Sequence, residues 1–150
     1  MKEIEGGITA PRGFVAAGIS CGIKKTGLLD LALVVSEREA SLAGVFTRNR
    51  VKAAPVLLCQ ERIAGGRFSA LVANSGNANA CTGPRGMKDA AEMARLTAKL
   101  LGRPEEQLLV ASTGVIGEPL PMEKISQGIA LAARSLGKGE GEKAARAIMT

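Results

Sequence analysis

The residues Ser112, Thr113 and Gly114 place two small hydroxyl side chains and a glycine directly after a short apolar run, residues 107–111. A strand that only has to end in a turn is served more simply by Asn-Gly or Asp-Gly. A small hydroxyl beside a glycine can instead present a side-chain O–H and an unshielded backbone N–H to an anion, or to an oxyanion that forms during a reaction. The residue types alone thus leave two interpretations open, an ordinary turn and an oxyanion or anion site.

Residues 74–83 form a second candidate, because three Asn side chains and two glycines fall between an expected strand and an expected helix. Asn77 and Asn79 are typical of an Asx turn and a helix cap. Amides in a loop at this position can also shape a binding pocket. The residue types alone leave both interpretations open.

Two further charged segments have ordinary structural explanations. Arg48, Arg50 and Lys52 bring cations together after an apolar run, which suits either an anion site or a solvated edge that discourages strand-to-strand aggregation. The glycine-rich residues 137–143 match neither G-x-x-x-x-G-K-[ST] nor G-x-G-x-x-G and follow no strand. They predict a turn between two helices.

The chain contains no histidine, which excludes Ser-His-Asp and Cys-His catalysis within it. A catalytic base would have to be a carboxylate, a lysine, an α-amino group or a group on another chain. Cys21, Cys59 and Cys81 are far apart and odd in number. We therefore expect reduced thiols, and neither a metal site nor a disulfide framework.

Length and charge narrow the class of protein further. At 150 residues and 46% hydrophobic content, the chain is long enough for one domain with a sizeable core. Its net charge of +6 suits small anionic substrates, whereas three Phe with no Tyr or Trp argue against nucleic-acid binding. The acidic N-terminus and the lack of a long apolar run predict neither a signal peptide nor a membrane span, and hence a cytoplasmic protein.

The elements that must position these residues change in type along the chain. Apolar runs and turn signals predict a largely antiparallel sheet in the first half, with strands at residues 14–23, 28–36, 42–47, 54–62 and 68–74. Glu37-Arg38-Glu39 is expected as a turn. Helical spacing then predicts helices at 84–101, at 121–136 and from 142 to 148, with a strand at 107–111 before the second. This order predicts an α+β or layered α/β fold in which helices cover sheets.

Five segments, in order, resemble the N-terminal part of the bifunctional ornithine acetyltransferase family, also called glutamate N-acetyltransferase, of arginine biosynthesis. They are "GGITAPRGFVAAGI", "GVFTRNRVKAAPV", "NSGNANACTG", "STGVIG" and "AARAIMT". The resemblance extends from Gly6 to Thr150. It implies a layered α-β-β-α sandwich of the self-cleaving type with an N-terminal nucleophile, of which residues 1–150 are a single-domain portion.

The resemblance also implies an activity. Members of the family cut themselves to expose an N-terminal threonine on a second subunit, which carries an acetyl group from N-acetylornithine to glutamate with its own α-amine as base. Carried over residue by residue, the family's oxyanion hole falls on Thr113 and Gly114, and a substrate contact falls on Thr150 or on the threonine that follows it in the family's segment. No cofactor is implied, although some members also accept acetyl-CoA as donor. Two copies of each subunit are expected.

The sequence departs from the family pattern at its end. It stops at Thr150, inside the family's A-I-M-T-T-D segment, and so lacks the nucleophile and the cleavage site. We therefore expect the chain to be inactive without a second subunit, whether it is a fragment, a processed subunit or a separately encoded piece. The alternatives are a non-catalytic domain for small-anion binding or assembly, and an amidase or aminopeptidase of the same self-cleaving fold.

Overall fold

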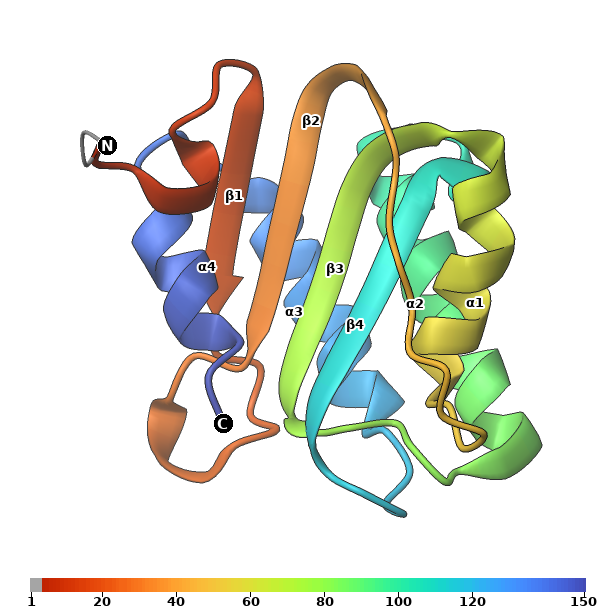
Figure 1. Cartoon of the computed structure of the whole chain (residues 1–150). Helices are drawn as coiled ribbons and strands as arrows, with labels where there is room; N and C mark the ends of the chain where they lie inside the picture. The colour runs from red at the N-terminus through yellow and green to blue at the C-terminus, as the bar shows by residue number, and fades with distance from the viewer. Residues whose placement is uncertain (1–3) are drawn as a thin grey trace.

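A four-stranded sheet runs through the computed structural model (Figure 1). The structure describes residues 4–150, apart from the side chain of Thr26. Residues 1–3 belong to the N-terminus for which the sequence predicts no signal peptide, and they lie outside the described residues. The strands, in spatial order, are β1 (Phe14–Ile19), β2 (Leu31–Ser41), β3 (Arg67–Asn77) and β4 (Leu108–Val115). β1, β2 and β3 pair antiparallel, whereas β3 and β4 pair parallel, so the sheet is mixed.

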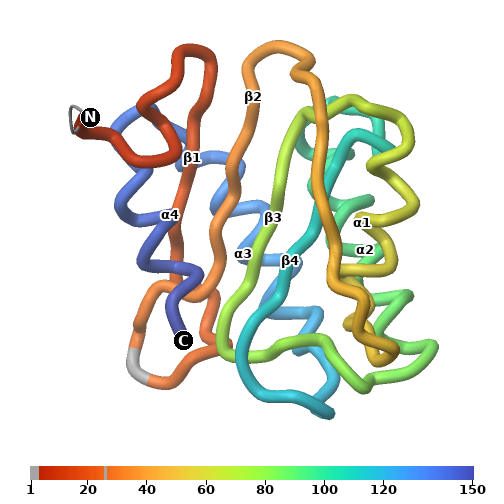
Figure 2. Tube along the Cα trace, in the orientation of Figure 1, coloured from red at the N-terminus to blue at the C-terminus, as the bar shows by residue number. Residues whose placement is uncertain are grey.

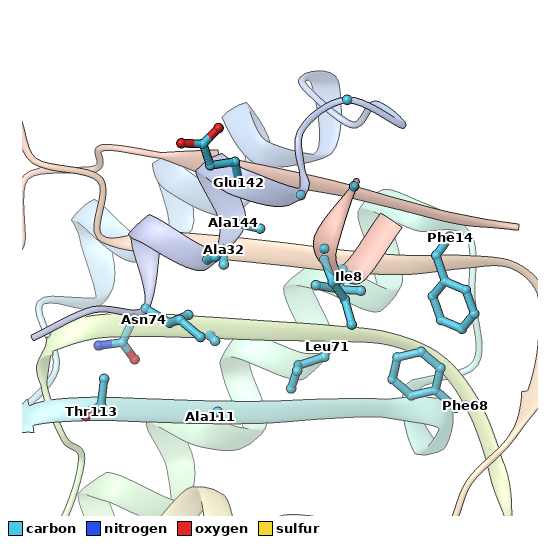
Figure 3. A pocket seen from close by; sticks show the side chains of 18 of the residues that line it. Ile8, Phe14, Ala32, Phe68, Leu71, Asn74, Ala111, Thr113, Glu142 and Ala144 are labelled. Carbon is cyan, nitrogen blue, oxygen red and sulfur yellow. The ribbon is translucent and has the colours of Figure 1, made fainter. Parts of the chain in front are cut away.

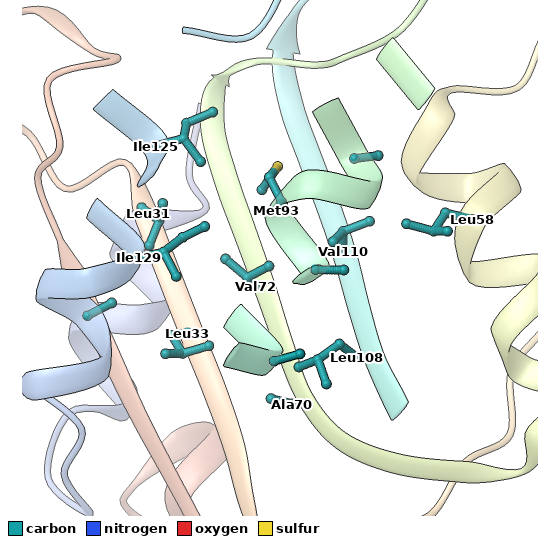
Figure 4. Packing of buried hydrophobic residues seen from close by; sticks show 14 of the residues in the cluster. Leu31, Leu33, Leu58, Ala70, Val72, Met93, Leu108, Val110, Ile125 and Ile129 are labelled. Atoms are coloured by element: carbon teal, nitrogen blue, oxygen red, sulfur yellow. The ribbon is translucent and has the colours of Figure 1, made fainter. Parts of the chain in front are cut away.

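Three α-helices cover one face of the sheet: α1 (Ala54–Arg62), α2 (Gly83–Leu101) and α3 (Met122–Arg134). Their apolar sides meet alternate residues of the strands in the main core, shown in Figure 4, which includes Leu31, Leu33, Leu58, Val72, Met93, Leu108, Val110, Ile125 and Ile129. Full burial of a side chain of this size stabilises the fold by about 1.5–3 kcal/mol. This face therefore contributes most of the apolar burial that holds β4 in place.

The opposite face is covered over β1 and β2 by the short helix α4 (Gly141–Ala147). Small residues allow this close approach, among them Ala16, Ala32 and Ala144. A Cβ on Gly18 would lie 2.1 Å from the carbonyl oxygen of Lys143, so only glycine fits beneath the helix. Figure 1 shows that α4 does not extend across β3 and β4.

The predicted helices are confirmed within two or three residues at each end. α2 has Pro84 in its first turn and ends at Gly102, which adopts a left-handed conformation with φ 62°. Residues 137–143 connect α3 to the start of α4, as expected for a turn between helices. The described residues also contain short 3₁₀ segments: η1 (Gly7–Thr9), η2 (Lys25–Gly27), η3 (Ile63–Gly65) and η4 (Glu105–Gln107).

Two strand predictions and one turn prediction are wrong. Residues 54–62 form helix α1, because Pro55 sits in its first turn while Leu58 and Cys59 turn to the core. An apolar run this short fits a buried strand or a helix equally well. Residues 42–47 have no regular structure. Glu37-Arg38-Glu39 lies within β2, where the register with β3 shifts between Val35 and Ala40, rather than in a turn.

The mixed α/β class predicted from the sequence is confirmed. The described residues hold one sheet, and β4, where the candidate site lies, is an edge strand of it. Among these residues, none of the helices is long and apolar enough to cross a membrane. Figure 2 shows the N-terminal segment beside β1 and the C-terminus near the lower ends of the strands.

Candidate active site at the end of strands β3 and β4

Thr113 and Gly114 lie inside β4, near its C-terminal end, rather than after it. They pair in parallel register with Ser75 and Gly76 of β3. Gly114 has φ 132°, and a Cβ there would lie 2.4 Å from the carbonyl carbon of Gly76. A glycine is therefore needed at position 114 for the strands to come this close. Gly114 is exposed and Thr113 is half-buried, so both are accessible from solvent.

A hydrogen-bonded network of buried polar groups fixes the conformation of this end of the sheet. The hydroxyl of Ser112 donates to the Oδ1 of Asn74 at 2.6 Å, and the Nδ2 of Asn74 donates to the carbonyl oxygen of Asn77 at 2.9 Å. Asn74 has no exposed surface. A hydrogen-bonded amide in such a site fixes the geometry of both strands, because breaking a bond would leave a buried polar group unpaired. The residues next to Thr113 are thus held rigidly.

Asn77 and Asn79 make the contacts of a turn and a helix start. The Oδ1 of Asn77 accepts from the N–H of Asn79 at 3.1 Å, and its Nδ2 donates to the carbonyl oxygen of Pro119 at 3.0 Å. The Nδ2 of Asn79 donates to the carbonyl oxygen of Gly86, and its Oδ1 accepts from the hydroxyl of Thr82. Neither Asn lines the cavity described next. These contacts favour the Asx-turn interpretation.

A cavity of about 1090 Å³ lies on the uncovered face of β3 and β4, between the sheet, η1 and α4. Figure 3 shows Thr113 and Asn74 near one end of it and the rings of Phe14 and Phe68 near the other. Its walls are mostly apolar side chains such as Ile8 and Leu71. The polar end of the cavity is therefore the strand end that the sequence singled out.

The titratable groups of the cavity lie away from Thr113. Among the residues that line it, only Glu5 and Glu142 have titratable side chains, and Figure 3 shows Glu142 beyond Ala144, across the cavity from Thr113. None of the lining residues is a lysine or a cysteine. The lining can thus supply hydrogen-bond donors at Thr113 but no base beside it.

Thr150 lies just after α4 and is exposed. The hydroxyl of Ser75, the register partner of Thr113, donates to the carbonyl oxygen of Ala147 at 2.6 Å. Ile148 lines the same cavity as Thr113, although Thr150 itself does not. The fold thus fastens the end of α4 to the strand residue beside Thr113, and the chain end of Figure 1 lies at the same end of the sheet.

The other sequence candidates lie elsewhere. Arg48 and Arg50 are exposed in the irregular segment, and the Nζ of Lys52 donates to the Oε1 of Gln60 at 3.3 Å. None of these cations lines the cavity. Their segment is not a strand, so these cations do not form the solvated strand edge that the sequence suggested.

The three cysteines are free thiols in separate surroundings. Burial raises the pKa of the Cys59 thiol, which donates to the carbonyl oxygen of Val110. Burial, followed by the neighbouring Asp30 carboxylate, raises the pKa of Cys21 from 9.0 to about 12. A thiol with a raised pKa is a poor nucleophile at neutral pH. Within residues 4–150, no three His, Cys, Asp or Glu side chains group closely enough to hold a metal ion.

Sequence reasoning missed Asp30 and Lys24. Asp30 is fully buried and accepts three backbone N–H bonds from the loop between β1 and β2. The sequence did contain a signal, since Asp30 stands directly before the apolar run of residues 31–35 and such a position predicts burial. A buried charge needs several hydrogen bonds to be tolerated, so a buried Asp30 would have to organise the loop around it.

These features define a class of protein: a mixed α/β chain whose edge strand ends in a rigid Thr-Gly pair over an open apolar sheet face. The model of the ArgJ family matches residues 15–150. The chain belongs to the ArgJ family.

Known relatives agree with this assignment. The chain is 56% identical to the arginine biosynthesis bifunctional protein ArgJ of Caldanaerobacter subterraneus subsp. tengcongensis and 52% identical to that of Geobacter sulfurreducens. These matches cover 100% and 93% of the chain but only 37% and 35% of the relatives. The chain thus spans little more than a third of the length of the curated relatives that it matches.

Two solved structures share its fold. Ornithine acetyltransferase from Mycobacterium tuberculosis, complexed with ornithine, superposes with a TM-score of 0.93 at 48% identity, covering 96% of this chain and 79% of that one. The ArgJ protein of Bacillus halodurans superposes with a TM-score of 0.89 at 43% identity, covering 97% and 76%. The name of the Mycobacterium neighbour thus records ornithine as its bound small molecule.

Proposed function

We propose that this chain is the first-subunit part of a glutamate N-acetyltransferase, which moves the acetyl group of N2-acetylornithine to glutamate through an acetyl-threonine intermediate. The names of the relatives and the ornithine bound to the Mycobacterium neighbour support this reaction class. The observation that carries the proposal is the pair Thr113 and Gly114, accessible to solvent but fixed in β4 by a glycine contact and by buried amides. In this reaction, the pair serves as the oxyanion hole.

The chemistry requires donors at the acetyl carbonyl. When the partner's threonine hydroxyl attacks, its oxygen bonds to the carbonyl carbon and the carbonyl oxygen becomes negative. The hydroxyl of Thr113 and the backbone N–H of Gly114 donate to that oxygen until the C–N bond to ornithine breaks and the carbonyl reforms. Donors that are already rigid need no reorganisation, so they stabilise the transition state more than the ground state.

The proton transfers are assigned to the second subunit. No lysine or cysteine lines the cavity beside Thr113, and the chain has no histidine. The α-amine of an N-terminal threonine can take the hydroxyl proton during attack and return it to the leaving ornithine amine. We assign no cofactor to the reaction. Acetyl-CoA, if accepted, acts as an alternative acetyl donor.

The open face of β3 and β4 supports the partner assignment. Its cavity is mostly apolar, and Val115 and Ile116 at the strand end are 58% and 65% exposed. Apolar area of this kind is normally covered by another element or chain. We assign this face to a second sheet from the nucleophile-bearing subunit, which would complete the α-β-β-α sandwich. Residues 1–150 then form one domain portion of an α2β2 enzyme.

Thr113→Ala in the complete, processed enzyme tests the function. Removing one oxyanion donor is expected to lower kcat on the order of 100- to 1,000-fold, roughly 2.7–4 kcal/mol, with little change in KM. The oxyanion hole can also act in self-cleavage, so precursor and processed forms are quantified separately by mass. Thr113→Ser keeps the hydroxyl and is expected to retain most activity. A wild-type kcat in the processed Thr113→Ala enzyme would contradict the oxyanion hole and leave this strand end as an ordinary turn.

A further inference from the structure

The loop between β1 and β2 is built around one buried carboxylate. Asp30 accepts the backbone N–H groups of Cys21 and Ile23, each at 2.7 Å, and that of Lys24 at 3.0 Å. Its own carbonyl oxygen accepts from the N–H of Ser75 at 2.8 Å. Hydrogen bonds to a charged acceptor are stronger than those between neutral groups. The loop is therefore fixed to β3 at the residue that pairs with Thr113.

The same loop packs directly against the end of β3. A Cβ on Gly76 would lie 2.9 Å from the Cγ2 of Ile23 and 3.2 Å from the Cγ of Lys24. Gly76 is also the residue that Gly114 approaches from the other side. The loop, the end of β3 and the Thr-Gly pair of β4 thus form one continuous packed unit.

Lys24 joins this unit to the segment that follows α4. Its ammonium group donates to the carbonyl oxygen of Leu29 at 3.1 Å, within the loop, and to the carbonyl oxygen of Met149. Residues 148–150 are exposed, and Met149 and Thr150 are outside any regular element. Figure 2 shows the chain end beside the loop. The bond of Lys24 to Met149 and the bond of Ser75 to Ala147 thus fix the end of α4 and the segment after it.

We infer that Lys24 is a positioning residue for substrate binding: it sets where Thr150 stands relative to Thr113, and Asp30 sets where Lys24 stands. The bond is made through a backbone carbonyl, so the hydroxyl of Thr150 stays available for substrate. A cation is also favourable near the carbonyl groups that end a helix. The inference rests on the proposed role of Thr150 in substrate binding.

Lys24→Met in the complete enzyme tests this assignment, because methionine keeps much of the length and removes the donor. The matched control is Lys124→Met. Lys124 also donates to a carbonyl of this loop, that of Gly22 at 2.8 Å, but no described contact joins it to residues 148–150. We expect Lys24→Met to raise KM about fivefold, the factor that one ordinary hydrogen bond is worth, with kcat nearly unchanged. The control should leave KM unchanged, and Lys24→Arg should recover most of the loss.

Two further measurements separate the lysine from the threonine. Hydrogen exchange of the peptide around residues 147–150 should become faster in Lys24→Met and not in Lys124→Met. In the double variant Lys24→Met/Thr150→Ala, KM should equal that of Thr150→Ala alone, because Lys24 acts through Thr150.

Each alternative outcome has a definite meaning. Faster exchange with an unchanged KM would support the positioning by Lys24 and contradict the proposed role of Thr150. A raised KM without faster exchange, or additive effects in the double variant, would mean that Lys24 contacts substrate itself, which overturns the inference. Unchanged exchange together with unchanged KM would overturn it as well.

Discussion

Single residues at the end of β4 are constrained by contacts that leave no room for other side chains. Gly114 combines a φ of 132° with a Cβ position only 2.4 Å from the backbone of Gly76. Gly102 also has a positive φ, 62°, but nothing lies within 4 Å of its Cβ position. A side chain at Gly102 would therefore meet backbone strain alone, whereas one at Gly114 would meet both strain and steric overlap.

Gly114→Ala is expected to destabilise the enzyme by at least about 2 kcal/mol, because conformational strain adds to an overlap with backbone that cannot move aside cheaply. Gly102→Ala should cost about 1 kcal/mol, from strain alone. Denaturant midpoints of the two variants measure the difference. Equal losses would show that the contact between Gly114 and Gly76 relaxes.

Thr150→Ala is expected to raise KM more than it lowers kcat. A hydroxyl that binds substrate equally in the ground state and the transition state affects KM alone. Steady-state kinetics of the complete enzyme with N2-acetylornithine and with glutamate measure both constants. An unchanged KM for both substrates would remove Thr150 from the binding site.

Cys21 makes stability depend on pH in the alkaline range. Burial and Asp30 raise its pKa from 9.0 to about 12 in the folded chain. Between these values the unfolded chain has lost the thiol proton and the folded chain has kept it, so the free energy of unfolding falls as pH rises. Urea midpoints at pH 8 and pH 10 should therefore differ less in Cys21→Ala than in wild type. Cys81→Ala, whose thiol is exposed, should keep the wild-type difference.

At the scale of elements, the segment between β3 and α2 is held by side-chain amides rather than by regular secondary structure. Asn79 is fully buried in a left-handed conformation with φ 46°, and all its amide contacts are local. Asn77 makes an Asx turn, in which its Oδ1 accepts from the N–H of Asn79, and Asn49 forms the same kind of turn at the surface, where its Oδ1 accepts from the N–H of Val51 at 3.2 Å. Burial is the difference between them, and it decides how much each turn contributes to stability.

Asn77→Ala and Asn79→Ala are each expected to lower the free energy of unfolding by about 1–3 kcal/mol, since their partners become buried and unpaired. Asn49→Ala should cost less than about 0.5 kcal/mol because water replaces its bond. Thermal unfolding together with kcat of the folded enzyme provides the measurement. A sharp loss of kcat at an unchanged melting temperature would instead assign these amides to the pocket.

At the scale of the whole molecule, the sheet is covered unequally. Three helices bury one face, whereas α4 covers only β1 and β2 on the other and leaves an apolar cavity of about 1090 Å³ over β3 and β4. The net charge of +6 does not cover this apolar area.

The isolated chain is therefore expected to bind an apolar dye on this face and to show no acetyl transfer. The complete enzyme should bind far less dye, and native mass spectrometry should find a partner whose first residue is threonine, in a complex of two copies of each. A monomeric chain with full transferase activity would contradict the two-subunit proposal.

The sequence by itself determined the features that depend on neighbours along the chain. Helical periodicity placed α2, α3 and α4, and the Thr-Gly pair marked the end of β4, because propensity and apolar spacing are local properties. Local pattern failed at residues 54–62, whose apolar run suits either element type. Packing of Leu58 and Cys59 against the sheet decided for a helix.

Only the tertiary structure decided how distant residues combine. The contact of Gly114 with Gly76, the bonds of Asp30 to its loop and to Ser75, and the bond of Lys24 to Met149 join residues that lie up to 125 positions apart. No local preference encodes such a partner, since each bond exists because the sheet register and the position of α4 bring the groups together. Residue types thus singled out Thr113 and Gly114 as candidates, but the rigid setting of these residues could not be predicted from the sequence.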